Sequence, residues 1–286
     1  MTARTVVVTD STASLPVEVA RERGIRVVPL QVVIGSQVYD EGSPGATPEA
    51  VAEALKSFVP VSTSRPNPAA TLEVYEELVR EGAESIVAVH LSADMSGTFE
   101  SAQLAARQAS VPVVAVDARQ VGAATGYAAL AAQDVLDAGG DAEEAAAAAR
   151  ARATASKSYF YVDTLEYLRR GGRIGAAAAV LGGALSVKPL LEIRDGRVES
   201  LEKVRTAGRA LARLEDLLVD AAGDRPVDVN ISHLANPERA EALAARLGER
   251  LAAQLEGRPV ECAELGAVLG AHVGPGMVAG VLSPRL

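Results

Sequence analysis

The chain is poor in the residues that build several common kinds of site. Cys262 is the only cysteine, tryptophan is absent, and aromatic residues make up 3% of the 286 residues. A single cysteine excludes an internal disulfide bond and a cysteine-rich metal site. Few aromatic side chains are available on which nucleic-acid bases could stack. The hydrophobic cores must therefore be packed from Ala, Val, Leu and Ile.

Positive charge is also in deficit. The 28 Lys and Arg residues face 37 Asp and Glu residues, which gives a net charge of -9 and disfavours a nucleic-acid surface. The longest weakly polar run, 174–187, is shorter than the about 18 to 20 residues that span a bilayer. Residues 1–4 lead into a strand without the apolar core of a signal peptide. We expect a cytoplasmic protein with no nucleic-acid partner and no membrane span.

Motifs of several enzyme classes are missing as well. The chain has no Gly-x-x-x-x-Gly-Lys-Ser/Thr loop, no His-Glu-x-x-His, no Cys-x-x-Cys and no Gly-x-Ser-x-Gly elbow. The stretch 274–279 matches the dinucleotide fingerprint by chance, since only ten residues follow Gly276 and no βαβ unit can be completed. We expect no metal site, no cofactor and no catalytic residues.

The length of the chain predicts two domains. Up to residue 155, Val-rich strands at 5–9, 85–91 and 113–117 alternate with helices at 17–23, 70–80, 99–108, 123–138 and 142–155. This alternation predicts a mostly parallel sheet flanked by helices in an N-terminal α/β domain, 1–157. Strands at 159–162, 227–232 and 260–264, helices at 206–220 and 237–251, and a hairpin of 186–193 with 197–204 around Asp195-Gly196 follow. They predict a C-terminal α/β domain, 158–286, with a mixed sheet.

Less regular segments lie between residues 25 and 68. The apolar run 25–34 contains Pro29, which predicts an edge or a bend, and 37–40 is expected to pair nearby. A helix is expected at 48–57 with Thr47 as its cap. The stretch 60–68 contains three prolines and is predicted to be a stiff loop. Thr63 and Ser64 in this loop form a cluster of neutral donors, unless the loop is merely a linker.

A second cluster of hydroxyl groups follows the strand 85–91. If Ser96 or Thr98 caps the next helix, its hydroxyl and the free backbone N–H groups converge, which suits a small anion. The helix terminus alone contributes only about 0.3–1 kcal/mol. Other donors must therefore converge on the same place.

Several further residues allow two interpretations. Asp10 and Ser11 follow the strand 5–9, where a ligand of a parallel sheet would bind, but they could instead only turn the chain and cap the helix 17–23. His272 lies between Gly270 and Gly274, which let the backbone approach a ligand or a packed neighbour closely. We interpret His90, inside a strand, as structural.

Arginines cluster around the short helix predicted after Asp163 or Thr164. Arg169, Arg170 and Arg173 either complement the dipole of this helix on a solvated surface or form a docking patch for a phosphate or an acidic partner. Arg205 precedes a helix, where an arginine opposes the helix dipole. It therefore points elsewhere or meets an anion.

The sequence resembles the DegV family of bacterial fatty-acid-binding proteins. The residues that carry the resemblance span nearly the whole chain in the order of the family: Thr9-Asp10-Ser11-Thr12, Thr63-Ser64-Arg65-Pro66, Leu91-Ser92, Ser96-Gly97-Thr98, Asp163–Leu168, Gly171–Ile174, Lys188-Pro189, Arg205-Thr206, His272 and Gly274-Pro275-Gly276. Two positions depart from the pattern. Arg65 stands where the family usually has glutamine, and Val273 where it often has threonine.

The resemblance implies two α/β domains with one buried long-chain fatty acid, whose carboxylate lies at the domain junction. It implies that the serine and threonine matching Ser96 and Thr63 hold the carboxylate, with His272 close by and with Ser64, Gly97 and Thr98 around them. The implied partner is a separate fatty acid kinase subunit that makes the acyl phosphate, followed by an acyltransferase that uses acyl phosphate. Arg173 and Arg205 would serve the encounter with the kinase or the acyl phosphate.

Other functions remain open at this point. Ser96, His272 and Asp10 supply the residue types of a Ser/His-dependent esterase or acyl transferase. A third hypothesis is a subunit that acts only through protein contacts. The binding hypothesis assigns affinity to the tail, because burying about fifteen methylenes at ~0.8 kcal/mol each gives about 12 kcal/mol before ordering costs. The head group then fixes the orientation of the ligand.

Overall fold

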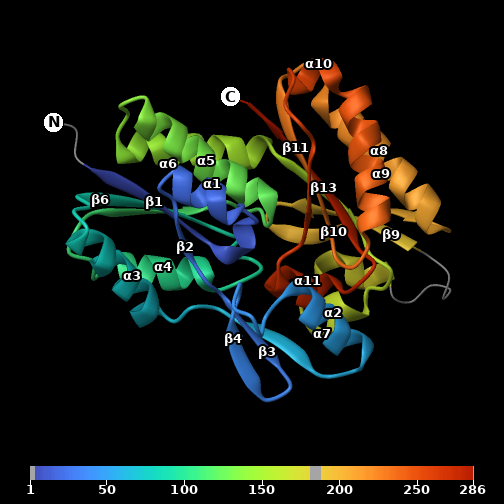
Figure 1. Ribbon diagram of the computed structural model, residues 1–286, viewed down its shortest axis with the longest axis horizontal. Coiled ribbons are helices and arrows are strands. Elements are labelled where there is room, and N and C mark those ends of the chain that lie inside the picture. Colours follow the sequence, from blue (N-terminus) through green and yellow to red (C-terminus); the bar gives the residue numbers. More distant parts are fainter. Residues whose placement is uncertain (1–3, 181–187, 286) are drawn as a thin grey trace. The chain divides into compact units, whose positions relative to one another are not determined.

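A computed structural model describes residues 4–180 and 188–285. The chain forms two compact units, each made of two separate segments. The first unit contains Met1–Gln31 and Ser64–Thr154, and the second contains Val32–Thr63 and Ala155–Leu286. The chain is coloured along its sequence in Figure 1.

The first unit is built on a four-stranded parallel sheet. Its strands are β1 (Thr5–Asp10), β2 (Arg26–Val28), β6 (Ser85–His90) and β7 (Val113–Asp117). They lie in the order β2-β1-β6-β7, and every neighbouring pair is parallel. The expected break at Pro29 is confirmed, because β2 ends at Val28 and lies at the edge of this sheet. The strands are Val-rich because a parallel sheet covered on both faces needs apolar residues on each.

Helices cover the two faces of this parallel sheet. They are α1 (Val17–Glu22), α3 (Pro68–Arg80), α4 (Thr98–Ala106), α5 (Ala123–Asp137) and α6 (Ala142–Ala155), with a 3₁₀ turn at Ser11–Ala13. Successive side chains of a strand point to opposite faces. Val7 accordingly packs with residues of α5 and α6, whereas Val6 and Val8 pack with residues of α3 and α4. Figure 1 shows these two helix pairs on opposite sides of the sheet.

The second unit contains a six-stranded mixed sheet in the order β10-β9-β8-β13-β11-β12. Its strands are β8 (Lys157–Tyr161), β9 (Lys188–Arg194), β10 (Arg197–Val204), β11 (Val227–His233), β12 (Glu261–Glu264) and β13 (Val278–Pro284). β11 and β12 are parallel, and the other neighbouring pairs are antiparallel. The predicted hairpin at Asp195-Gly196 is confirmed as β9 and β10. Its expected first residues, 186 and 187, lie outside the described residues.

Further helices connect the strands of this mixed sheet. They are α7 (Glu166–Arg170), α8 (Ala207–Ala222), α9 (Pro237–Arg250), α10 (Ala252–Leu255) and α11 (Ala267–Val273), with a 3₁₀ segment at Gly175–Val180. Leu214 and Leu218 of α8 and Leu243 of α9 form one buried cluster with Ile231 and Leu282 of the sheet. The apolar stripes of the two helices thus make the core of this unit.

The second unit also contains a separate three-stranded sheet in the order β4-β3-β5. Its strands are β3 (Gln31–Ile34), β4 (Gln37–Asp40) and β5 (Val61–Ser64), and α2 (Pro48–Lys56) connects two of them. Thr47 caps α2 as expected, since its Oγ1 accepts the N–H of Ala50 at 3.1 Å. The predicted loop at 60–68 is wrong for residues 61–64, because Pro60 and Pro66 flank the paired segment and leave its backbone N–H groups free for β3.

The predicted α/β class, with a parallel sheet flanked by helices and a second mixed sheet, is confirmed. The strand β13, in the interior of the mixed sheet, was not predicted. The compact units also differ from a single division at residue 157, because residues 32–63 group with the C-terminal segment. Within the described residues, no helix is long and apolar enough to cross a membrane.

Candidate functional site

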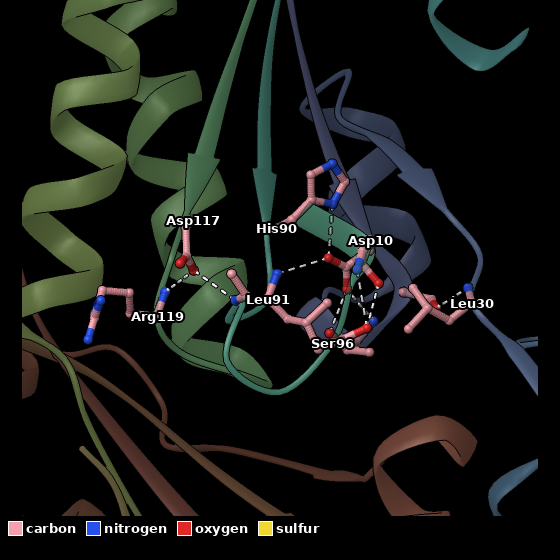
Figure 2. A network of polar contacts seen from close by, with 11 residues as sticks. Asp10, Leu30, His90, Leu91, Ser96, Asp117 and Arg119 are labelled. Atoms are coloured by element: carbon pink, nitrogen blue, oxygen red, sulfur yellow. Dashed lines mark hydrogen bonds and ion pairs between the residues drawn. The ribbon is translucent and has the colours of Figure 1, made fainter. Parts of the chain in front are cut away.

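Polar residues end three adjacent strands of the parallel sheet. β1 ends at Asp10, β6 at His90 and β7 at Asp117, and the carboxyl ends of parallel strands share one edge of a sheet. Figure 2 shows Asp10 and Asp117 on either side of Leu91, the residue that follows β6. This edge carries the segment 91–97, which we call the Ser96 loop.

Asp10 is fully buried and accepts four hydrogen bonds. Its Oδ1 accepts the backbone N–H of Thr12 at 3.1 Å and the hydroxyl of Thr12 at 2.5 Å. Its Oδ2 accepts the backbone N–H of Leu91 and lies 3.0 Å from Nδ1 of His90. A carboxylate only accepts, so Nδ1 of the buried His90 carries the proton. Asp10 therefore joins the turn after β1 to the end of β6.

The Ser96 loop is also held by its own backbone and by Asp117. The carbonyl of Ser92 accepts the N–H groups of Met95 and Ser96, each at 3.1 Å. Oδ1 of Asp117 accepts the N–H of Ala93 at 3.2 Å. The loop is thus a tight turn whose geometry depends on both neighbouring strands.

Ser96 and Thr98 lie together at the start of α4. Their hydroxyl oxygens are 2.9 Å apart, and Oγ of Ser96 accepts the N–H of Thr98 at 3.3 Å. The expectation that Ser96 or Thr98 caps the helix is wrong in position. Gly97 is the N-cap residue, and Ser96 precedes it, because its hydroxyl reaches only the first N–H of the helix. The hydroxyl pair still lies at the amino end of α4, where anions are favoured.

Arg65 covers the backbone of Gly97. Its Nη1 donates to the carbonyl of Gly97 at 3.1 Å and to Glu100 at 2.9 Å. A Cβ atom on Gly97 would lie 1.6 Å from this Nη1, so a side chain at this position would displace the guanidinium group. Ser64, next to Arg65, donates to Oε1 of Gln31 at 3.1 Å and is exposed.

Ser11 holds a structural contact of the first unit. Its Oγ accepts the N–H of Leu30 at 2.9 Å and so ties the 3₁₀ turn to the connection between β2 and β3. Asp10 and Ser11 therefore hold the turn after β1, but the expectation that they also cap the helix 17–23 is wrong, because Pro16 is the N-cap residue of α1 and no side chain caps it. A direct contact of either residue with a ligand stays a prediction.

Thr63 and His272 meet in the second unit although they are 209 residues apart. Oγ1 of Thr63, in β5, lies 2.8 Å from Nε2 of His272, in the last turn of α11. The other ring nitrogen, Nδ1, is buried without a hydrogen-bond partner among the described residues. A Cβ atom on Gly171 would lie 2.2 Å from Nδ1, so the missing side chain of this glycine makes room for the ring.

The imidazole of His272 is neutral at physiological pH. Burial of the ring lowers its pKa from 6.5 to about 4, and the positive charge of Arg173 adds to this effect. Nη1 of Arg173 donates to the carbonyl of Gly171 at 2.6 Å, and Gly171 is also the residue that packs against the imidazole ring. His272 therefore takes part in hydrogen bonding as a neutral group.

Glycines around His272 allow the close approach that their spacing indicated. A Cβ atom on Gly274 would lie 2.0 Å from the ring of Tyr167, and one on Gly276 would lie 2.2 Å from Oδ2 of Asp163. At the other end of α11, Oε1 of Glu41 accepts the N–H of Val268 at 2.7 Å. Contacts at both ends thus fix the short helix that carries His272.

The arginine cluster divides into two groups. Arg169 and Arg170 both pair with Glu166 at 2.7 Å on an exposed helix, which agrees with the interpretation as a solvated surface. Arg173 faces Gly171 and His272 instead. Arg205 is exposed directly before α8, where Thr206 accepts the N–H of Arg209 at 3.3 Å as the helix cap.

Sequence reasoning missed two residues that shape these clusters, Glu41 and Asp117, and also the pairing of His90 with Asp10. An acid or a histidine at the carboxyl end of a predicted parallel strand is the signal that could have indicated the last two. Glu41 follows a short strand of another sheet and carries no such signal. Among the described residues, no group of three His, Cys, Asp or Glu side chains could hold a metal ion.

Comparison with known proteins places the chain in a family. The DegV family model, described as an uncharacterised protein, matches residues 4–285. A DegV domain-containing protein of Streptomyces coelicolor is 50% identical over 285 residues, with 100% of each chain covered.

Solved structures of two further proteins are similar to this chain. A DegV family protein from Thermus thermophilus, described by its fatty acid binding, has 32% identity and a TM-score of 0.88, with 99% of this chain and 100% of that chain covered. DegV from Bacillus subtilis, described as a fatty acid binding protein, has 30% identity and a TM-score of 0.89 with the same coverage. The chain belongs to the DegV family.

Proposed function

We propose that this protein binds one long-chain fatty acid, holds its carboxylate with serine and threonine hydroxyls, buries its acyl chain and presents it to a separate fatty acid kinase. The fatty acid binding described for the relatives from Thermus thermophilus and Bacillus subtilis supports the ligand class. The observation that carries the proposal is the hydrogen bond between Thr63 and the neutral His272.

That hydrogen bond prepares Thr63 to donate to an anion. A carboxylate only accepts hydrogen bonds, so Thr63 must turn its own hydrogen to the ligand and accept from Nε2–H of His272. The neutral tautomer with its hydrogen on Nε2 satisfies this requirement. In this tautomer Nδ1 carries no hydrogen, so no buried N–H group is left without an acceptor among the described residues.

Ser96 and Thr98 offer a second donor in the same way. Their two hydroxyls are in contact, so one hydroxyl can donate to the other while the second hydrogen remains available. When Thr98 is the donor of this pair, the hydrogen of Ser96 remains available to the ligand. We assign the carboxylate to Thr63 with His272 and to Ser96 with Thr98, with Gly97 and Ser64 as secondary contacts.

Energetics separate the roles of the two ends of the ligand. Hydrogen bonds to a charged head group contribute about 1.5–3 kcal/mol each, or roughly 10- to 150-fold in affinity. The acyl chain contributes about 0.8 kcal/mol per buried methylene and therefore dominates affinity. Loss of one hydroxyl should weaken binding without abolishing it.

Lipid extraction and native mass spectrometry of the purified protein test the ligand class directly. We expect one C14 to C18 fatty acid per chain. Delipidated protein should take up palmitic acid again. Protein that arrives empty and takes up no fatty acid would contradict the proposal.

Substitutions then test the head-group assignment. Thr63→Val and Ser96→Ala should each raise the Kd for palmitic acid about 10-fold or more, while Ser57→Ala, at the exposed C-cap of α2, should leave it unchanged. Wild-type affinity in both Thr63→Val and Ser96→Ala would refute the assignment. Protein that binds no fatty acid at all would instead favour a subunit that acts through protein contacts alone.

The esterase or acyl-transferase hypothesis finds less support. A Ser/His/acid triad needs a carboxylate that accepts from Nδ1 of the histidine. Nδ1 of His272 has no hydrogen-bond partner among the described residues, and both oxygens of Asp10 are taken by Thr12, His90 and Leu91. Ester turnover that disappears in Ser96→Ala would restore this hypothesis.

The kinase partner would transfer the γ-phosphoryl group of ATP to a carboxylate oxygen, which yields ADP and an acyl phosphate for an acyltransferase. We assign Arg173 and Arg205 to the encounter or to the acyl phosphate. Arg205→Ala should slow acyl phosphate formation by the kinase without changing the Kd for palmitic acid. Arg209→Ala, which removes another exposed arginine in the first turn of α8, is the matched control. Equal rates in Arg205→Ala and wild type would refute the role of Arg205.

A further inference from the structure

The Ser96 loop depends on acidic side chains that lie outside it. Asp10 holds its first residue through the N–H of Leu91 at 3.0 Å, and Asp117 holds its third residue through the N–H of Ala93 at 3.2 Å. The two acids end the strands on either side of β6, as Figure 2 shows. The loop is therefore attached to the sheet on both sides.

Of the two acids, Asp10 has the stricter hydrogen-bonding requirement. It is fully buried, and a buried carboxylate is tolerated only where hydrogen bonds replace its hydration. Each of its oxygens accepts one backbone N–H, from Thr12 on one side and from Leu91 on the other. Both carboxylate oxygens are thus required, and His90 holds one of them from within β6.

His90 acts on Asp10 and not on a ligand. Its side chain is 1% exposed, its Nδ1 lies 3.0 Å from Asp10, and its Nε2 is buried without a hydrogen-bond partner among the described residues. The ring therefore serves as a donor that fixes the rotation of the carboxylate. This rotation in turn aims Oδ2 at the N–H of Leu91.

We propose that Asp10, oriented by His90, is a positioning residue that holds the Ser96 loop in the conformation in which the Ser96 hydroxyl meets the head group of the ligand. The proposal rests on the proposed function of Ser96. Neither Asp10 nor His90 contacts the ligand in this role. Their effect on binding passes through the N–H of Leu91 and the backbone of the loop.

The same isosteric substitution, Asp to Asn, should have different effects at Asp10 and Asp117. Asp10→Asn replaces one acceptor oxygen by an NH₂ group, which in either amide orientation faces a backbone N–H that cannot turn away. Asp117 uses a single oxygen, Oδ1, for the N–H groups of Ala93 and Arg119. Asp117→Asn can keep both hydrogen bonds with its amide oxygen. It removes the same charge beside the same loop and is the matched control.

Binding of palmitic acid and of 1-hexadecanol, which has the same tail length and a neutral head group, is the first readout. Asp10→Asn should weaken palmitic acid at least 10-fold and 1-hexadecanol no more than about 3-fold, whereas Asp117→Asn should match wild type for both. In the Asp10→Asn background, Ser96→Ala should add less than 3-fold, because the loop has already lost its position. Equal loss for both ligands, or full additivity with Ser96→Ala, would overturn the proposal.

A second readout needs no ligand and so separates this proposal from the proposed function. Hydrogen exchange of the Leu91 and Ser96 amides in delipidated protein should be at least 10-fold faster in Asp10→Asn than in wild type or Asp117→Asn. Unchanged exchange would refute the positioning role even if palmitic acid binds. Wild-type protein that binds no fatty acid would instead refute the proposed function.

His90 provides a variant pair for the case in which Asp10→Asn does not fold. His90→Asn places an amide N–H near the position of Nδ1 and should retain affinity for palmitic acid within about 3-fold. His90→Leu cannot donate to Asp10 and should lose at least 10-fold with little change for 1-hexadecanol. Equal affinities in His90→Asn and His90→Leu would overturn the proposal.

Discussion

His272 is expected to make the stability of the delipidated protein depend on pH. Its pKa is lowered from 6.5 to about 4 in the folded chain, first by burial and then by Arg173. Between these values the unfolded chain binds a proton that the folded chain does not. The contribution of His272 to the free energy of unfolding is therefore fully present above about pH 6.5 and is lost as the pH falls toward 4.

The size of this effect follows from the two pKa values. At about 1.4 kcal/mol per pH unit, the full difference corresponds to about 3 kcal/mol. About 2 kcal/mol of it should be lost between pH 7 and pH 5. Most carboxylates remain ionised over this range, so His272 should supply a large part of the change.

Urea denaturation of wild type and His272→Gln at pH 7 and pH 5 isolates the contribution of this ring. Glutamine can still donate to Thr63 but does not titrate. Wild type should lose about 2 kcal/mol more than the variant between the two pH values. The chain has three histidines, so an NMR titration can follow each one, and His272 should titrate near pH 4. Equal losses in both proteins, or titration of His272 near 6.5, would refute the reasoning.

Further substitutions test the packing around this histidine and the turn chemistry of the second unit. Glu41→Gln weakens the cap of α11 and should cost about 1 kcal/mol in urea denaturation, and no loss would contradict the capping role. Gly171→Ala places a Cβ atom 2.2 Å from Nδ1 of His272 and should cost about 1–3 kcal/mol and shift the NMR signals of that ring. Gly196→Ala, at a φ of 82°, should cost about 1 kcal/mol. Gly248→Ala, inside α9 with open space around the Cβ position, should instead raise stability by about 0.5–1 kcal/mol. If both substitutions change stability in the same direction, the backbone angle φ does not determine their effect.

Local patterns in the sequence predicted most of the elements because each depends on neighbouring residues. The Val-rich strands β1, β6 and β7 and the Ala-rich α5 and α6 combine strong periodicity with matching propensity. β5 was missed because Pro60 and Pro66 were weighed as breakers, although only residues 61–64 pair with β3. β13 was missed because its Ala279 and Gly280 have low strand propensity. Pairing with β8 on one side and β11 on the other stabilises this strand instead.

The candidate site was predictable in its residue types and not in its contacts. Ser96, Thr98, Thr63 and His272 were selected from local patterns and from the resemblance. The structure pairs Ser96 with Thr98 and Thr63 with His272. No local rule relates positions 209 residues apart or matches the buried Asp10 to His90, because such pairs are created by the topology of the sheets.

The grouping of residues 32–63 with the C-terminal segment limits how this protein can be divided. A fragment that stops at residue 157 would carry Thr63 but not His272, its partner at 2.8 Å. The remaining fragment would lack β3, β4, β5 and α2 and would leave the acid that caps α11 on the other polypeptide. We therefore expect that neither half of the gene, expressed separately, yields an intact second unit, and that mixing the two products is needed to restore it.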